Sequence, residues 1–206
     1  MTKIIFITSG KIEYQLGKLS LYESMIRVGM GKEFPHITKD ARVEILKITK
    51  ELKKSNPVII YSATSFQTIE TANIISRKLN LKIIKSKNLL PLRFNLNNLI
   101  QENDFYNFKE EKFNIVREKF LTAFFENKLL DDNNEIKRRF KYLIKVISKK
   151  QKNKTVIVVS HAYLIKLFYV YYKLGDRMFI DKNKLFNLFQ PSKEPLGRLG
   201  RFEIKI

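Results

Sequence analysis

Cysteine and tryptophan are absent from the 206 residues, and only two histidines occur, His36 and His161. A chain without cysteine has no disulfide framework, no thiolate zinc site and no cysteine nucleophile. Two histidines are too few for a histidine-rich metal site. We therefore expect neither a metal nor another cofactor.

Long hydrophobic runs are also missing. The longest apolar stretches, residues 155–160 and 164–172, are too short or too interrupted to span a bilayer. The start of the chain, where Met1-Thr2-Lys3 precedes Ile4–Ile7, lacks the apolar stretch of a signal peptide. These absences predict a cytoplasmic protein without a membrane partner. The length and the 44% hydrophobic content predict one globular domain over residues 1–206.

Acidic residues are scarce: 20 Asp and Glu stand against 40 Lys and Arg, which gives a formal charge of +20. Such a charge is typical of nucleic-acid-binding proteins. The lysines, however, are spread along the chain, and no RNA-binding, zinc-finger or basic-zipper pattern accompanies them. We therefore favour a solvated basic surface, produced by compositional drift, over a nucleic-acid site.

Short apolar runs alternate with amphipathic segments. Strands are predicted at residues 4–7, 58–61, 81–84 and 155–159, because each is apolar and bounded by turn or polar residues. Helices are predicted after Thr38, around Ile69–Leu79, around Ile136–Ile147 and over 163–173. This order predicts an α/β fold with a mostly parallel sheet.

Two further regions are less regular. Aromatic residues recur near helical spacing between Asp104 and Asn127, a pattern typical of core packing. The tail contains Leu185–Phe189, a turn with Pro and Gly, and a terminal strand or hairpin at residues 201–206.

The carboxyl ends of parallel strands are where functional groups gather in an open α/β sheet. His161 follows the strand at 155–159 and precedes a helix, whose first N–H groups favour anions. A single histidine at such a place fits either a functional residue or a structural residue that orders the turn.

Four segments resemble the histidine phosphatase superfamily, which has the phosphoglycerate mutase-like fold. Residues 156–166 resemble its second-histidine motif, and residues 37–41 its Leu-Thr-x-x-Gly helix start. Residues 61–72 resemble its Tyr-Ser-Ser-Pro-x-x-Arg-x-x-x-Thr-Ala segment, and Glu135 stands where the family often has Glu-Ser. The resemblance implies a three-layer α/β/α sandwich and a phosphorylated small molecule or protein as partner.

The chain departs from the family where the chemistry takes place. The family carries Arg-His-Gly at the first strand end, and its histidine accepts the phosphoryl group; here the triplet is Thr8-Ser9-Gly10. Lys11 replaces a common Glu, Gln67 replaces the second phosphate-binding arginine, and residues 90–92 lack the general acid. The resemblance thus implies His161 and Ser9 as catalytic positions, and as substrate-binding positions Thr8, Gly10, Lys11, Ser62 and Gln67.

These losses affect phosphoryl transfer directly. One missing charge-assisted donor costs about 3 kcal/mol of transition-state stabilisation, and a missing nucleophile removes the covalent path. Lys11, Arg27 and Arg93 are the cations that nearby loops could supply. Three hypotheses follow: an inactive domain retained for binding or scaffolding, an active phosphatase or mutase with a rearranged site, and a hydrolase in which His161 activates Ser9.

Overall fold

A five-stranded sheet forms the centre of the protein, with strand order β3-β2-β4-β1-β5. The computed structural model describes residues 1–14, 17–189 and 200–206. The strands are β1 (Lys3–Thr8), β2 (Pro57–Ser62), β3 (Ile83–Lys85), β4 (Thr155–Ser160) and β5 (Arg201–Lys205). The first four are parallel and β5 runs antiparallel to β1, so the mostly parallel sheet is confirmed.

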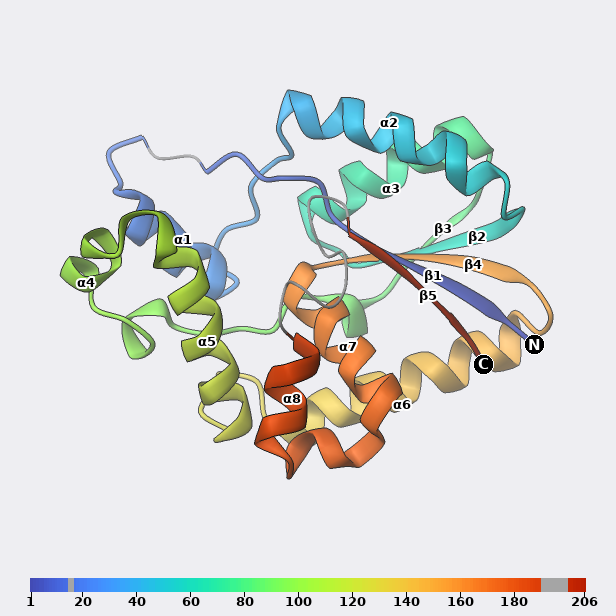
Figure 1. Cartoon of the computed structure of the whole chain (residues 1–206). Helices are drawn as coiled ribbons and strands as arrows, with labels where there is room; N and C mark the ends of the chain where they lie inside the picture. Colours follow the sequence, from blue (N-terminus) through green and yellow to red (C-terminus); the bar gives the residue numbers. More distant parts are fainter. Residues whose placement is uncertain (15–16, 190–199) are drawn as a thin grey trace.

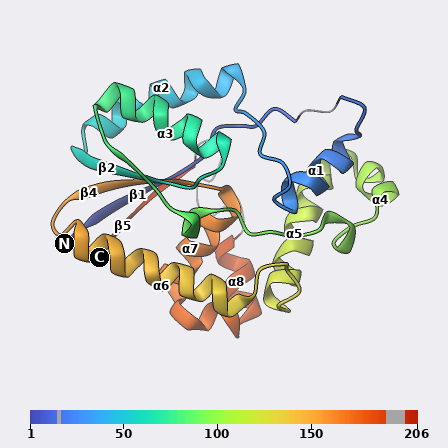
Figure 2. The same ribbon diagram turned by 180° about the vertical axis from the view of Figure 1, so that it is seen from behind.

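Helices cover both faces of this sheet (Figures 1 and 2). One face carries α2 (Lys39–Lys53) and α3 (Phe66–Leu79), and the other carries α6 (Asn133–Lys150) and α7 (Ala162–Leu174). The central strands β1 and β4 are buried over most of their length, because helices exclude water from both faces. The three layers that the family resemblance implied are therefore present.

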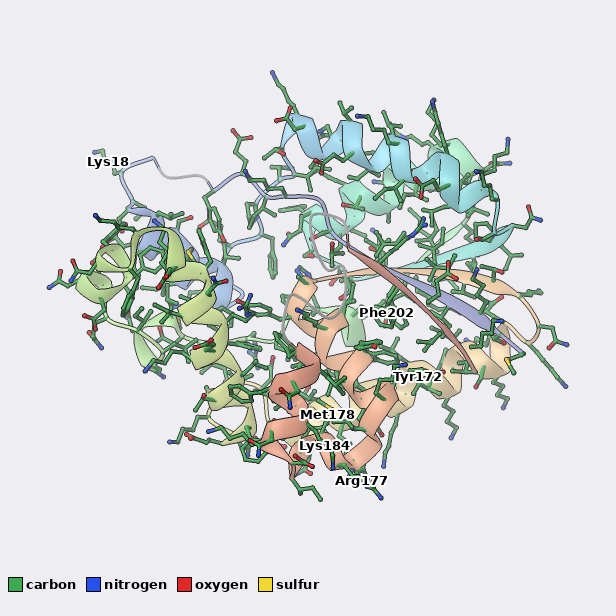
Figure 3. All side chains as sticks on the ribbon, viewed as in Figure 1. Lys18, Tyr172, Arg177, Met178, Lys184 and Phe202 are labelled. Atoms are coloured by element: carbon green, nitrogen blue, oxygen red, sulfur yellow. The ribbon has the colours of Figure 1, made fainter. Side chains whose placement is uncertain are left out.

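A side lobe lies beside the strand ends in Figure 1 and consists of α1 (Leu21–Gly29), α4 (Glu102–Asn107) and α5 (Lys112–Phe125). Its small core contains Tyr22, Leu96, Ile100, Phe105 and Val116. Two 3-10 turns, η1 (Lys87–Leu89) and η2 (Leu96–Asn98), lie on the path from β3 to this lobe. Lys18, on the loop before α1, points outward from its edge (Figure 3).

The aromatic stripe between residues 104 and 127 was only partly predicted. A third 3-10 turn, η3 (Lys109–Glu111), separates α4 from α5, so the spacing does not continue along one helix. Phe105, Phe120 and Phe124 are buried as expected. Phe108 and Phe113 are 40% and 51% exposed, so their assignment to the core was wrong.

The third strand begins two residues later than predicted because the preceding helix ends in a turn that uses Leu81. Asn80 adopts a left-handed conformation, and the N–H of Leu81 donates to the Ser76 carbonyl at 3.2 Å. Leu81 is thereby held at the helix end rather than in the sheet.

The tail contributes η4 (Gly175–Phe179), α8 (Lys182–Phe189) and the edge strand β5. The terminal strand is therefore confirmed, whereas the predicted Pro- and Gly-containing turn lies outside the described residues. Met178 and Phe202 belong to the core beneath the sheet, while Lys184 lies at the outer side of α8 (Figure 3). Within the described ranges, none of the helices has the length and apolar character needed to cross a bilayer.

Candidate functional site

The carboxyl ends of β1 and β4 lie side by side and bring Ser9 next to the His161 segment. Thr8 is paired with Ser160 in the sheet, and the N–H of Ser9 donates to the Ser160 carbonyl at 2.8 Å. The sequence thus placed the first and fourth strand ends correctly at one edge.

Gly10 allows the loop after β1 to pass close to α2. A Cβ atom at this position would lie 2.9 Å from the Ala41 Cβ and 3.2 Å from the Ile45 Cδ1. The N–H of Gly10 donates to the Thr71 Oγ1 of α3 at 3.1 Å. The glycine therefore fixes the path of the strand end between two helices.

His161 contacts the start of α3 through both nitrogens of its ring. It is the N-terminal cap of α7, and its Nε2 lies 2.9 Å from the Oγ of Ser65, the N-cap residue of α3. Its Nδ1 lies 3.4 Å from the Nε2 of Gln67. Ser65 and Gln67 are only 2% and 3% exposed, so the ring is held by buried partners.

The surrounding hydrogen bonds assign the tautomer of this ring. The single proton of the Thr68 hydroxyl is shared between the carbonyls of Ala63 and Ser65, whose oxygens lie 3.1 and 2.9 Å from Oγ1. In the 2.8 Å contact between the Ser65 and Thr68 hydroxyls, Ser65 is therefore the donor. Its oxygen is then free to accept from the Nε2–H of His161, and Gln67 donates to Nδ1. This consistent chain of donors leaves His161 neutral and protonated on Nε2.

Burial, together with the positive charge of Arg139, lowers the pKa of His161 to about 3. The imidazole is thus neutral at physiological pH. A neutral ring whose two nitrogens already have partners is not arranged to stabilise a phosphate dianion.

Ser9 is not engaged with His161 in the way that serine activation requires. Its side-chain oxygen makes no hydrogen bond with any residue that the structure describes, and the ring nitrogens of His161 contact Ser65 and Gln67 instead. A serine nucleophile needs its base within hydrogen-bond reach. The geometry therefore disfavours the hydrolase hypothesis.

The other predicted binding residues have mainly structural contacts. Thr8 is buried and its N–H donates to the Gly200 carbonyl, and the Ser62 hydroxyl donates to the Ala63 carbonyl. The Lys11 side chain is exposed, and its carbonyl accepts from the Thr38 N–H at 2.9 Å. Gln67 is therefore the only one of the predicted binding positions whose side chain contacts His161 within the described part of the chain.

Among the described contacts, Arg93 and Arg27 form no hydrogen bond or ion pair with Ser9, Gln67 or His161. Arg93 forms an ion pair with Asp131 at 2.9 Å, and Arg27 is exposed on the last turn of α1. Glu135 is exposed near the start of α6, where its closest cation is Arg138 at 3.9 Å. None of the described groups of acidic and histidine side chains has a geometry that could hold a metal ion.

Sequence reasoning missed Ser65 and Arg139. Ser65 precedes Gln67 by two residues at a predicted helix start, a position that favours serine, and this was the available signal. Arg139 is 5% exposed and lies on the apolar face of α6 with Ile136, Phe140 and Leu143. A single arginine within an apolar stripe indicates a buried charge that needs carbonyl or carboxylate partners.

The strand order, the position of the second histidine and the helix starts around it define the class of protein. A family model described as histidine phosphatase superfamily (branch 1) matches residues 26–188. The chain belongs to this superfamily.

Solved structures with the same fold include three phosphatases or hydrolases. Phosphoserine phosphatase from Entamoeba histolytica, in complex with 3-phosphoglyceric acid, is 19% identical, with a TM-score of 0.62 over 98% of this chain and 90% of that one. A mycobacterial glucosyl-3-phosphoglycerate phosphatase is 12% identical, with a TM-score of 0.62 over 98% and 89%. Mycobacterial hydrolase 1 is 13% identical, with a TM-score of 0.64 over 98% and 89%. Among curated proteins, no sequence matches this chain.

Proposed function

We propose that this protein is a histidine phosphatase superfamily member that does not catalyse phosphoryl transfer and is retained as a binding domain. One observation carries the proposal: both ring nitrogens of His161 are hydrogen-bonded to buried neutral residues, Ser65 and Gln67. At the adjacent strand end, Ser9 stands where the family resemblance places the phosphorylated histidine. The covalent path has no nucleophile of the required type.

The electrostatics of the strand edge support the same proposal. Phosphoryl transfer relies on cationic donors fixed around the equatorial oxygens. The side chains brought together here, those of Ser9, Ser65 and Gln67, are neutral. Arg139 is close enough to affect His161, but its guanidinium donates to the carbonyls of Asn88 and Leu90. Two of its donor nitrogens are therefore already bonded to backbone carbonyls.

Gln67 indicates the chemistry of a ligand that this site would accept. Its Oε1 is buried and lacks a hydrogen-bond partner among the described residues. A buried carbonyl oxygen without a partner costs about 1–3 kcal/mol, which a ligand hydroxyl or amide would recover by donating to it. The site therefore favours a donor-bearing neutral group over a dianion.

Turnover measurements test the loss of phosphatase activity. Purified protein is assayed with an aryl phosphate, phosphoserine and 3-phosphoglycerate beside an active family member, and we expect no turnover that depends on this chain. Matched variants are His161→Ala, Ser9→Ala and the triple change Thr8→Arg, Ser9→His and Gln67→Arg, which restores the family pattern. Turnover that survives both single changes indicates a contaminant, whereas turnover abolished by either one contradicts the proposal and supports a rearranged active site.

A further inference from the structure

A cavity of about 430 Å³ lies between the segment after β3 and the first turns of α6. Figure 2 faces this side of the molecule, where the segment after β3 runs past α6. The residues that line the cavity do not include Ser9, Gln67 or His161. The charged side chains that line it are four cations and two acids: Lys87, Arg93, Arg138, Arg139, Asp131 and Glu135.

Asp131 is already satisfied by Arg93. The backbone N–H and the Nε of Arg93 donate to the two oxygens of Asp131 at 2.7 and 2.9 Å. The Asp131 carboxylate is 6% exposed, whereas the Arg93 side chain is 54% exposed, so only the acid is withdrawn from water. The nearest atom of Arg139 lies 4.0 Å from Asp131, beyond hydrogen-bond distance. The negative charge of Asp131 is therefore balanced by Arg93.

Two other cations at the cavity retain free donors. Lys87 is exposed and has no acidic partner in the described part of the chain. The Nη2 of Arg138 lies 3.9 Å from the Glu135 carboxylate, too far for a hydrogen bond. An ammonium and a guanidinium that line the same cavity match the oxygens of a phosphate, which accept from several donors at once.

Arg139 is buried, is held by backbone carbonyls and adds positive charge to the cavity lining. Its Nε donates to the Asn88 carbonyl at 3.1 Å, and its Nη2 donates to the Leu90 carbonyl. Burial lowers the pKa of Arg139 despite the opposing charges of Asp131 and Glu135, and the charge of Arg93 adds to this lowering. The cluster therefore contains cations that repel one another, and a bound anion would relieve this repulsion.

We propose that this cavity is an anion site for a small phosphorylated compound, with Lys87 and Arg138 as ligand contacts and Arg139 as a positioning residue. Its volume falls within the range of small-molecule sites. The excess of cations over acids excludes a metal or a cationic ligand and favours a dianion. The cavity lining does not include Ser9, Gln67 or His161, although Arg139 also acts on the His161 ring, and the inference is independent of the proposed loss of phosphatase activity.

Calorimetric titration with inorganic phosphate and with phosphoserine tests the site. Both are measured on the full chain at one fixed ionic strength, because general attraction to a basic protein depends on salt. We expect saturable binding that weakens at least tenfold in the double variant Lys87→Ala, Arg138→Ala. The matched control is Lys85→Ala, Lys145→Ala, which removes the same charge from exposed positions outside the cavity lining. We expect its affinity to stay within twofold of that of the parent protein.

Three results would overturn the proposal. The first is that neither inorganic phosphate nor phosphoserine binds saturably. The second is equal weakening in the cavity variant and in the control, which indicates attraction by net charge alone. The third is an affinity that is unchanged in the cavity variant but is lost in Gln67→Ala. This result would place the anion at the strand edge. Circular dichroism and thermal unfolding of each variant establish that all of them are folded.

Discussion

His161 is the residue on which the interpretation of the strand edge depends. Its position after β4 matches a site histidine, and the family assignment supports that position. Its contacts, however, lie within the protein, because the Ser65 hydroxyl and the Gln67 amide occupy its two nitrogens. His161 therefore occupies a site position in the sequence, but its ring is neutral and both of its nitrogens are hydrogen-bonded.

The stability of the protein should depend on pH through this ring. Burial holds the pKa of His161 at about 3, whereas a histidine in the unfolded chain has a pKa of about 6.5. Between these values the unfolded state binds one more proton, so the free energy of unfolding decreases as the pH falls. The contribution has a slope of up to about 1.4 kcal/mol per pH unit.

Urea unfolding at pH 7.5, 6 and 5 measures this contribution. We expect the parent protein to lose stability more steeply than His161→Gln as the pH is lowered. The matched control is His36→Gln, which removes an imidazole that is 57% exposed and should keep the steep slope. Equal slopes for the parent and His161→Gln would contradict the assignment of a neutral ring with a lowered pKa.

At the scale of elements, the sequence predicted the parts whose patterns are local. The apolar runs of β1, β2 and β4 and the Thr38 cap of α2 are set by adjacent residues, and the structure confirms them. The sequence did not predict α1, the division between α4 and α5, or the contacts of His161 with α3. These depend on packing between segments far apart in the chain, which neither propensity nor periodicity determines.

The contact between the β1 loop and α2 provides a test of element packing. Gly10→Ala should destabilise the protein by about 1–3 kcal/mol, because the added methyl group would overlap Ala41. Ala41→Gly costs about 0.5–1 kcal/mol in a helix but provides the missing space. In a double-mutant cycle measured by chemical unfolding, we expect the combined variant to be more stable than the sum of the single effects predicts. Additive effects would show that the two elements are not in close contact.

At the scale of the molecule, the side lobe and the sheet meet close to the strand edge. Phe120 of α5 stacks on Tyr163 of α7, and their ring centroids lie 4.4 Å apart. Tyr163 follows His161 by two residues. Burial raises the pKa of Tyr163 to about 12, so its hydroxyl remains protonated. This packing does not involve Ser9, Gln67 or His161, so the contact between lobe and sheet does not depend on those side chains.

Detection of a phosphorylated protein tests the central claim most directly. The chain is mixed with an aryl phosphate, quenched rapidly and weighed by intact mass spectrometry, with an active superfamily member as positive control. The account predicts that the parent protein gains no phosphoryl group and that the triple variant Thr8→Arg, Ser9→His, Gln67→Arg gains one at position 9. A phosphoryl group found on Ser9 or His161 of the parent protein would contradict it.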